Sequence, residues 1–130
     1  MPILSAEALT LFVTRLFTAA GVPEDDAWRV ASSLVGANLR GHDSHGVMRV
    51  PQYIDYLEKG AYQVGVALRV EHETPAVVVC DARWGLGQVQ AHRLLALIVP
   101  KATSISRSVN RRSSEPRIFC TLTPRPSAIR

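Results

Sequence analysis

Two apolar stripes at helical spacing occupy the first 41 residues, and the short link between them restricts the folds that this chain can adopt. The first stripe follows Ser5, a residue type favoured at helix N-caps, and it stops at Gly21. The second opens with Pro23 in its first turn and stops at Gly41. The stripes consist of Leu9, Phe12, Val13, Leu16, Phe17 and Ala20, and of Ala27, Val30, Ala31, Leu34 and Val35. We therefore expect an antiparallel pair of helices.

Two further helices are expected later in the chain. Residues 51–58 predict a third helix, with Pro51 in its first turn, because an interior proline would remove a backbone hydrogen bond. Gly60 provides its stop. Helical spacing resumes over residues 86–99 and predicts a fourth helix.

Between these helices the pattern changes to that of strands. Residues 66–70 alternate as a half-buried strand does, and residues 76–80 form a continuous apolar run typical of a buried strand. The turn between the two strands is expected at Thr74–Pro75. The expected fold class is therefore α+β (mixed α/β), with N-terminal helices packed with a short strand pair and a further helix.

The positive charge of the chain is concentrated near its C-terminal end. Residues 1–100 hold eight Lys and Arg against ten Asp and Glu, whereas residues 101–130 hold seven against one. The net charge of +4 thus comes from the last segment, and residues 1–100 have no electrostatic footprint for nucleic acid. The last segment is rich in Ser, Arg and Pro, so we expect a tail that is disordered or translated out of frame. We accordingly divide the chain into a domain at 1–100 and a basic tail at 101–130.

Composition and patterning point to a soluble protein of the cytoplasm. Hydrophobic residues make up 47% of the chain and charged residues 20%, as in globular domains. No apolar run approaches the roughly 20 residues that cross a bilayer, and the N-terminus lacks the features of a signal peptide. Cys80 and Cys120 are too few for a disulfide scaffold and are not spaced as a metal site.

The segment LRGHDSHGVMRVPQY, residues 39–53, gathers the side chains best suited to chemistry. Ser44 and His45 are adjacent, and Gly41 and Gly46 on either side permit the sharp turn that would bring hydroxyl and imidazole together. An imidazole with a pKa near neutrality can give or take a proton at a substrate hydroxyl. We therefore regard Ser44 and His45 as a candidate proton-handling pair.

An arginine and a tyrosine extend this cluster. His45, Arg49 and Tyr53 recur at intervals of four residues and would share one face of a continuous helix. A guanidinium binds a carboxylate at two points, and a tyrosine hydroxyl can add a third contact. The cluster as a whole fits a small 2-hydroxy or 2-oxo acid.

Simpler interpretations of the same residues compete with this one. His42, Asp43 and Ser44 are also typical of a turn between helices, in which Asp43 or Ser44 would act as a cap. A metal site is disfavoured, because His42 and His45 have only Asp43 nearby, and no metal ion is expected. A Ser–His hydrolase is disfavoured as well, since adjacent residues rarely reach the geometry of nucleophile and base.

The stretch WGLGQVQ is a weaker motif. Gly85 and Gly87 follow a strand and open a helix, which is the setting of a dinucleotide-binding turn. Gln90 stands where the third glycine of that motif belongs, so a structural turn is favoured.

Taken together, these motifs resemble the malate/L-lactate dehydrogenase family, the non-Rossmann group that includes ureidoglycolate and sulfolactate dehydrogenases. The resemblance runs in order over about residues 5–100. Besides the helix pair it consists of Arg40–Gly41, Ser44–His45–Gly46, Arg49, Tyr53, Asp81 and Gly87–Gln88. Members of the family run much longer, so the resemblance implies an N-terminal fragment with a truncated version of the family fold.

The resemblance implies an NAD(P)-dependent oxidoreductase that transfers hydride between NAD or NADP and a small 2-hydroxy or 2-oxo acid, working as a homodimer. Ser44 and His45 would be catalytic, and Arg49 and Tyr53 would bind the substrate. The cofactor-binding residues are unknown, because the family's cofactor site lies mostly beyond this segment. The fragment alone is expected to be inactive. The alternative is a small non-enzymatic helical domain that binds a carboxylate or a partner through the same cluster.

Overall fold

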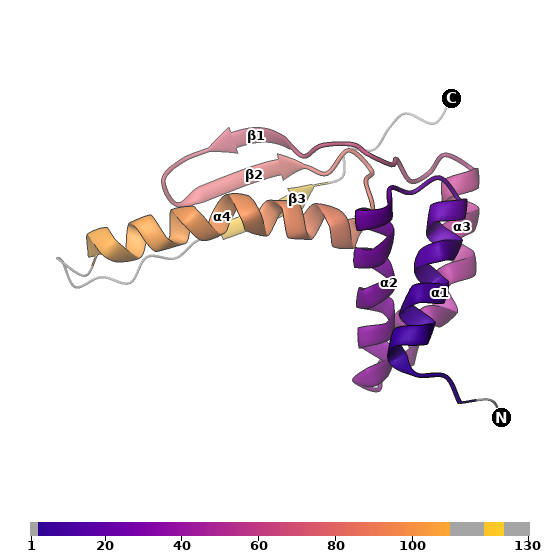
Figure 1. Ribbon diagram of the computed structural model, residues 1–130. Coiled ribbons are helices and arrows are strands. Elements are labelled where there is room, and N and C mark those ends of the chain that lie inside the picture. Colours follow the sequence, from indigo (N-terminus) through magenta and orange to yellow (C-terminus); the bar gives the residue numbers. More distant parts are fainter. Residues whose placement is uncertain (1–2, 110–118, 124–130) are drawn as a thin grey trace. The chain divides into compact units, whose positions relative to one another are not determined.

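A computed structural model of the chain describes residues 3–109 and 119–123, and Figure 1 shows the helices and strands. The chain divides into two compact units, Met1–Gly65 and Val66–Arg130. The first unit is helical, and the second combines a sheet with one helix.

The first unit opens with the expected helix pair, α1 (Ala6–Ala19) and α2 (Glu24–Leu39), which lie side by side in Figure 1. Ser5 caps α1, since its hydroxyl oxygen accepts a hydrogen bond of 3.2 Å from a backbone N–H of the first turn. Gly21 follows the end of α1 with a φ of +89°, a left-handed conformation that glycine adopts without steric cost. Pro23 lies one residue before α2 rather than inside its first turn.

The packing faces of the two helices were predicted with unequal success. The buried residues of α2 are the predicted ones, Ala27, Val30, Ala31, Leu34 and Val35. In α1, however, Phe12 and Leu16 are 58% and 38% exposed, whereas Thr14 is buried. The hydroxyl of Thr14 donates to the carbonyl of Thr10 at 2.8 Å, which satisfies this polar group inside the core. The buried arc of α1 is thus narrower than the apolar stripe, and Phe12 and Leu16 lie beside it.

Two single turns of 3₁₀ helix and a third α-helix complete the first unit. The turns are η1 (Asp43–His45) and η2 (Val47–Arg49), and α3 (Val50–Glu58) follows directly. Pro51 lies in the first turn of α3, as predicted, where its missing N–H costs no intrahelical hydrogen bond. Gly60 follows the helix with a φ of +68°. Helix α3 therefore begins immediately after the segment that holds the candidate site.

A cluster of aromatic rings packs α3 against α1. The fully buried ring of Phe17 meets Tyr53 edge-on, with 6.0 Å between the ring centroids. Tyr62, which follows α3, lies 5.4 Å from both Tyr53 and Tyr56. Edge-on pairs of this kind are favourable beyond the area that they bury, so they fix which side of α3 faces α1.

The second unit is a three-stranded sheet with one long helix. Its elements are β1 (Arg69–Glu73), β2 (Val77–Asp81), α4 (Gly87–Val109) and β3 (Phe119–Thr123). The strand order is β1-β2-β3, with β1 and β2 antiparallel and β2 and β3 parallel. Helices together with an antiparallel strand pair confirm the predicted α+β class.

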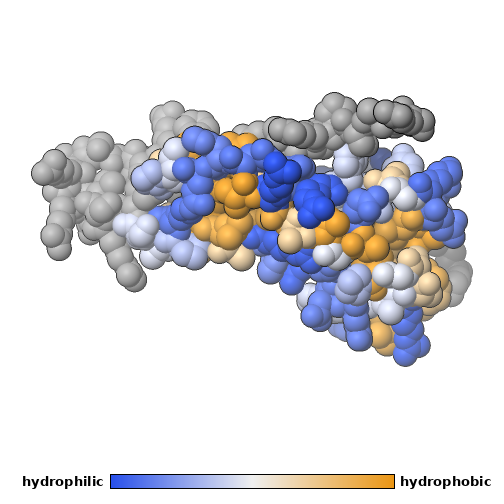
Figure 2. All heavy atoms as spheres, turned by 90° about the horizontal axis from the view of Figure 1, so that it is seen from above, coloured by the Kyte–Doolittle hydropathy of each residue, from blue (hydrophilic) through white to orange (hydrophobic). Residues whose placement is uncertain are grey.

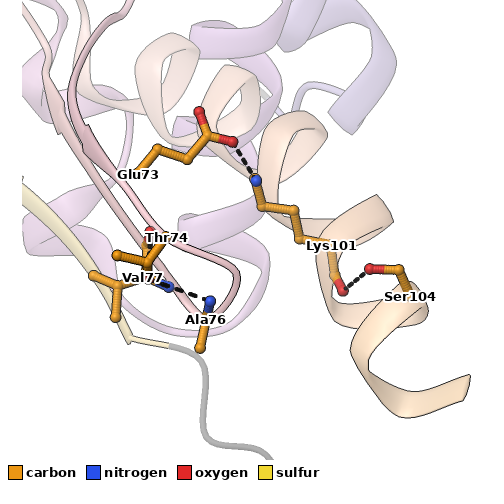
Figure 3. A network of polar contacts seen from close by, with 6 residues as sticks. All are labelled: Glu73, Thr74, Ala76, Val77, Lys101 and Ser104. Carbon is orange, nitrogen blue, oxygen red and sulfur yellow. Dashed lines mark hydrogen bonds and ion pairs between the residues drawn. The ribbon is translucent and has the colours of Figure 1, made fainter. Parts of the chain in front are cut away.

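The turn between β1 and β2 lies at Thr74, as predicted, and Figure 3 shows its contacts. The backbone N–H of Thr74 donates to the carbonyl of Val77 at 2.8 Å. The Thr74 hydroxyl accepts from the N–H groups of Ala76 and Val77 at 3.4 and 3.0 Å. Beside the turn, the ammonium of Lys101 in α4 pairs with the carboxylate of Glu73. This ion pair ties α4 to the end of β1.

The core of the second unit lies between β2 and α4. It consists of Val78, Cys80 and Leu94, with Leu68 and Ile98 packed against them. Strand β2 alternates between buried and half-buried residues, so the predicted continuous burial over 76–80 is wrong. Strand β1 begins at Arg69, later than predicted, and is exposed along its length. Before it, Val66 and Leu68 are half-buried and Ala67 is exposed, as the predicted alternation requires.

Regular structure continues into the segment for which we predicted disorder. Helix α4 runs past residue 99 and through Pro100 to Val109, and β3 lies at 119–123. An interior proline removes one backbone hydrogen bond, but here it does not end the helix. Over residues 101–109 and 119–123 the structure thus differs from the predicted disorder, and the other tail residues lie outside the described residues. The domain boundary at residue 100 and the out-of-frame origin of the tail stay predictions.

Candidate functional site

The loop between α2 and α3 is built around one side chain, that of Asn38 near the end of α2. Its Nδ2 donates to Oδ1 of Asp43 at 2.5 Å, and its Oδ1 accepts from the N–H of Val47 at 2.8 Å. A Cβ added to Gly46 would lie 2.1 Å from Asn38 Oδ1, far closer than real atoms approach. The loop therefore requires glycine at position 46, and Asp43 is a turn residue, as one of the two interpretations predicts.

The candidate proton-handling pair lies on η1. The hydroxyl oxygen of Ser44 is 3.0 Å from Nδ1 of His45, which is within hydrogen-bond distance. The single 3₁₀ turn is closed by backbone hydrogen bonds of 2.9 Å from His45 to His42 and from Gly46 to Asp43. Both side chains of the pair are exposed. The structure thus brings Ser44 and His45 together, as predicted.

Arg49 lies beside this pair. Its Nε donates to the backbone carbonyl of Ser44 at 2.7 Å, and its Nη1 donates to Oε1 of Gln52 at 2.7 Å. Gln52 in turn donates from Nε2 to the hydroxyl oxygen of Tyr56 at 3.0 Å. The predicted carboxylate-binding residue is therefore held from two sides, by the η1 turn and by α3.

Tyr53 is placed differently from the other three predicted site residues. Gly46 has an extended backbone (φ −91°, ψ −157°), so the continuous helix that would place His45, Arg49 and Tyr53 on one face is not formed. The ring of Tyr53 packs against Phe17 and Tyr62 in the aromatic cluster. Its role as a third contact to the substrate stays a prediction.

Three residues that shape the site were not predicted, namely Asn38, Gln52 and Tyr56, and the ring of Tyr62 packs against that of Tyr56. Gln52 and Tyr56 carry a signal in the sequence, because they follow Arg49 at the i+3 and i+7 positions of a helical face. The pKa of Tyr62 is raised above its ordinary value of 10.0, chiefly by burial and further by the negative charge that Tyr53 and Tyr56 carry when they ionise.

Hydrophobic side chains border the cluster. Figure 2 shows hydrophobic residues on the surface among the hydrophilic ones. The exposed hydrophobic residues of the first unit include Met48, which lies between His45 and Arg49 in the chain and is 66% exposed, and Leu39, which is 73% exposed. The candidate site is thus a polar cluster on an open surface with apolar neighbours.

The glycine turn at Gly85–Gly87 lies between β2 and the start of α4, the setting in which a dinucleotide-binding turn is found. A Cβ added to Gly85 would lie 2.0 Å from Nε2 of Gln90, so the Gln90 side chain itself occupies the space beside this glycine. Gln90 is 1% exposed, and its Nε2 donates to the carbonyl of Val66 at 2.9 Å. Internal packing thus accounts for glycine at position 85, which supports the structural interpretation of the motif.

Two further observations concern the described residues. Among them there is no group of three or more His, Cys, Asp and Glu arranged to hold a metal ion. Within the same ranges, no helix has both the length and the apolar character needed to cross a membrane.

The helix pair, the Ser-His-Gly loop and the strand pair define a dehydrogenase-like class of protein. The sequence model of the malate/L-lactate dehydrogenase family matches residues 4–109, and the chain belongs to this family. The predicted family and the predicted fold class are therefore confirmed, and the family is one of oxidoreductases.

Two relatives illustrate the match. The chain is 42% identical over 96 residues to a malate dehydrogenase of Pyrococcus horikoshii, covering 74% of this chain and 27% of that protein. It is 39% identical over 89 residues to an L-sulfolactate dehydrogenase of Methanocaldococcus jannaschii, covering 68% and 26%. The chain thus spans about a quarter of the length of these curated relatives.

The solved structures agree. The malate dehydrogenase structure from Pyrococcus horikoshii matches with a TM-score of 0.75 at 40% identity, covering 78% of this chain and 29% of that one. The similarity therefore extends to the fold of the described residues.

Proposed function

We propose that this chain supplies the proton-handling pair and the carboxylate-binding arginine of an NAD(P)-dependent oxidoreductase that acts on a small 2-hydroxy or 2-oxo acid. One observation carries the proposal. Ser44 Oγ lies 3.0 Å from His45 Nδ1, and Arg49 Nε is hydrogen-bonded at 2.7 Å to the carbonyl of the same Ser44. A proton donor or acceptor and a carboxylate clamp are therefore fixed to one turn.

His45 handles the substrate's proton in this proposal. If Nδ1 donates to Ser44 Oγ, then Nε2 carries a lone pair and can accept the proton of a substrate hydroxyl during oxidation. In the reverse direction the imidazolium, which carries a proton on each nitrogen, delivers its Nε2 proton to the 2-oxo group while Nδ1 still donates to Ser44 Oγ. The same hydrogen bond thus serves both directions of the reaction, as the ring passes between its neutral and its protonated form.

Arg49 binds the substrate carboxylate. A 2-hydroxy acid carries its carboxylate on the carbon that bears the hydroxyl, so a proton acceptor and an arginine must act close together. Malate and sulfolactate, which appear in the names of the two relatives, share this grouping. Tyr53 is proposed as a third contact. The described residues assign no part of the NAD or NADP site, and no step is derived through it.

The remaining proposals rest on the family resemblance. We propose that the whole protein works as a homodimer in the cytoplasm, without a nucleic-acid or membrane partner. We also propose that this chain alone is inactive, because it spans 27% of its Pyrococcus relative.

The test is a titration of the chain with L-malate, followed by isothermal calorimetry. Arg49→Met should raise the Kd about tenfold or more, because a charge-assisted carboxylate contact is lost. Arg15→Met removes an exposed arginine from α1 and is the matched control, with an unchanged Kd. Equal binding by the native chain and Arg49→Met would contradict the proposal.

A further inference from the structure

We propose that Gln52 and Tyr56 are positioning residues, which hold the guanidinium of Arg49 in the orientation that binds a carboxylate. The proposal deepens the proposed function and rests on it. Neither residue takes part in the chemistry, and both lie on α3, the helix that follows the candidate site.

The contacts form a chain of two hydrogen bonds along α3. Arg49 Nη1 donates to Gln52 Oε1 at 2.7 Å, and Gln52 Nε2 donates to the Tyr56 hydroxyl oxygen at 3.0 Å. The spacings of three and four residues place the three side chains on one face. A guanidinium has only donors, so the Gln52 amide must turn its oxygen toward Arg49 and its NH₂ toward Tyr56. Each end of the amide is thus used.

Ring packing holds Tyr56, the last residue in this series of hydrogen bonds. Tyr56 meets Tyr62 edge-on, with 5.4 Å between ring centroids and 85° between ring planes. Gln52 and Tyr56 are half-buried, whereas Arg49 is exposed. A long exposed side chain loses conformational entropy when a bound substrate orders it. If contacts within the protein order the side chain beforehand, this loss no longer weakens binding. Through its two hydrogen bonds, Gln52 therefore connects the side chain of Arg49 to the packed ring of Tyr56, which limits the motion of the guanidinium.

The geometry leaves the arginine competent to bind. Of its five N–H donors, one goes to Ser44 and one to Gln52 within the described part of the chain, and the others are available to a carboxylate. Because two-point binding requires a fixed guanidinium plane, contacts from both sides favour it. Gln52 also holds Arg49 through a neutral oxygen, so the positive charge that attracts the substrate is not neutralised, as it would be by glutamate.

The experiment compares Gln52→Met and Tyr56→Phe with two matched controls in the full chain. Gln63→Met removes an amide that contacts only the Gly60 carbonyl among the described residues, at 2.8 Å, and Tyr62→Phe removes a hydroxyl while keeping the ring. Two quantities are measured for each variant. They are the Kd for L-malate and the ¹⁵N order parameter of Arg49 Nε, which a merely structural change elsewhere would not move.

Gln52→Met should lower the order of Arg49 Nε and raise the Kd about tenfold. Tyr56→Phe should act in the same direction, and the double variant should be no worse than Gln52→Met alone, because both act through one chain of contacts. Gln52→Glu should keep Nε ordered yet weaken malate binding, since its charge competes with the ligand. Both controls should match the native chain.

Two different failures can be told apart. If the order parameter of Arg49 Nε is unchanged in both Gln52→Met and Tyr56→Phe, the positioning role is overturned, whatever the Kd for L-malate. A loss of order in these variants, combined with malate binding that does not depend on Arg49, supports the positioning role and refutes the proposed function. Gln52→Glu keeps an acceptor at the same place, so the charge comparison stands even if Gln52→Met folds poorly.

Discussion

A residue without catalytic chemistry, Asn38, determines the geometry of the candidate site. Its side chain bridges the loop from Asp43 to Val47 and lies where any Cβ at position 46 would be. The backbone of Gly46 has a φ of −91°, which every residue type adopts. Glycine is thus required here by a close contact and not by the backbone conformation.

Gly46→Ala should therefore destabilise the chain by about 1–3 kcal/mol, because Asn38 must swing away and lose two hydrogen bonds. The measurement is the free energy of unfolding in urea. Gly36→Ala, inside α2, is the control, since the nearest atom to its new Cβ is the flexible end of Arg40 at 3.1 Å. That change should be neutral or stabilising by up to about 1 kcal/mol.

The coupling of the two positions supplies a second check. In an Asn38→Ala background, Gly46→Ala should cost much less than it does in the native chain, because the side chain that it displaces is gone. Additive effects of the two substitutions would show that the close contact is not the cause.

Tyr62 gives the molecule an alkaline pH dependence. Burial and the neighbouring Tyr53 and Tyr56 raise its pKa above 10.0, so the folded state disfavours the phenolate. Below pH 10 both the folded and the unfolded chain hold this proton, and the stabilisation is fully present. As the pH rises above 10, the unfolded chain loses the proton first, and stability falls until the folded pKa is passed.

The expected outcome is a loss of unfolding free energy above pH 10 that is smaller in Tyr62→Phe. Tyrosinate absorbance should also show one late-titrating tyrosine in the native chain that the variant lacks. A variant that loses stability along the same alkaline curve as the native chain would contradict this assignment.

At the scale of elements, helical periodicity predicted α2 well and α1 less well. The stripe of α2 is buried as predicted, because it is confined to one arc. In α1 the apolar residues spread beyond the arc that the partner covers, and spacing alone cannot tell that Thr14 is inside while Phe12 is outside. Burial depends on the neighbouring element, which a single helix's sequence does not describe.

The candidate site shows the same division. Adjacency in the chain predicted that Ser44 and His45 meet, and Arg49 lies beside them as expected. The side chains at intervals of four residues do not share a continuous helical face, because the backbone of Gly46 is extended and ends the helical run. Asn38 could not be found, because its contact with Val47 spans nine residues and depends on how the loop folds back. Spacing in the sequence thus predicts contacts between near neighbours, whereas contacts between more distant residues depend on the conformation of the loop.

Gly85 and Gly87, around the start of α4, differ in what an added side chain would meet. Gly85→Ala should destabilise by about 1–3 kcal/mol, because the buried Gln90 amide would be displaced from the Val66 carbonyl. Gly87→Ala meets nothing within 4 Å and should be neutral or slightly stabilising, since alanine suits a helix better. Thermal unfolding of the two variants decides the matter. Equal destabilisation by both would show that the Gln90 contact is not what requires glycine.

At the scale of the whole molecule, the chain holds two compact units and corresponds to 27% of the Pyrococcus malate dehydrogenase. The proposed proton-handling pair and Arg49 lie in the first unit, whereas the cofactor has no assigned residues in the described part of either. Activity is therefore a property to be tested in the context of a complete relative.

A chimera makes that test. The segment of the Pyrococcus malate dehydrogenase that aligns with this chain over 96 residues is replaced by the corresponding residues of this chain. Once circular dichroism shows that the chimera is folded, it should oxidise malate, because the relative supplies the remaining three quarters. His45→Ala in the chimera should lower kcat about 10²- to 10⁴-fold, the usual contribution of general acid–base catalysis.

His72→Ala is the matched control, since His72 is an exposed histidine on β1 outside the cluster. It should leave kcat unchanged. A folded chimera whose kcat is the same with and without His45 would exclude His45 as the proton-handling residue. A folded chimera that binds malate in an Arg49-dependent manner but never turns it over would instead favour the non-enzymatic carboxylate-binding domain, because the clamp would be intact while the chemistry was absent.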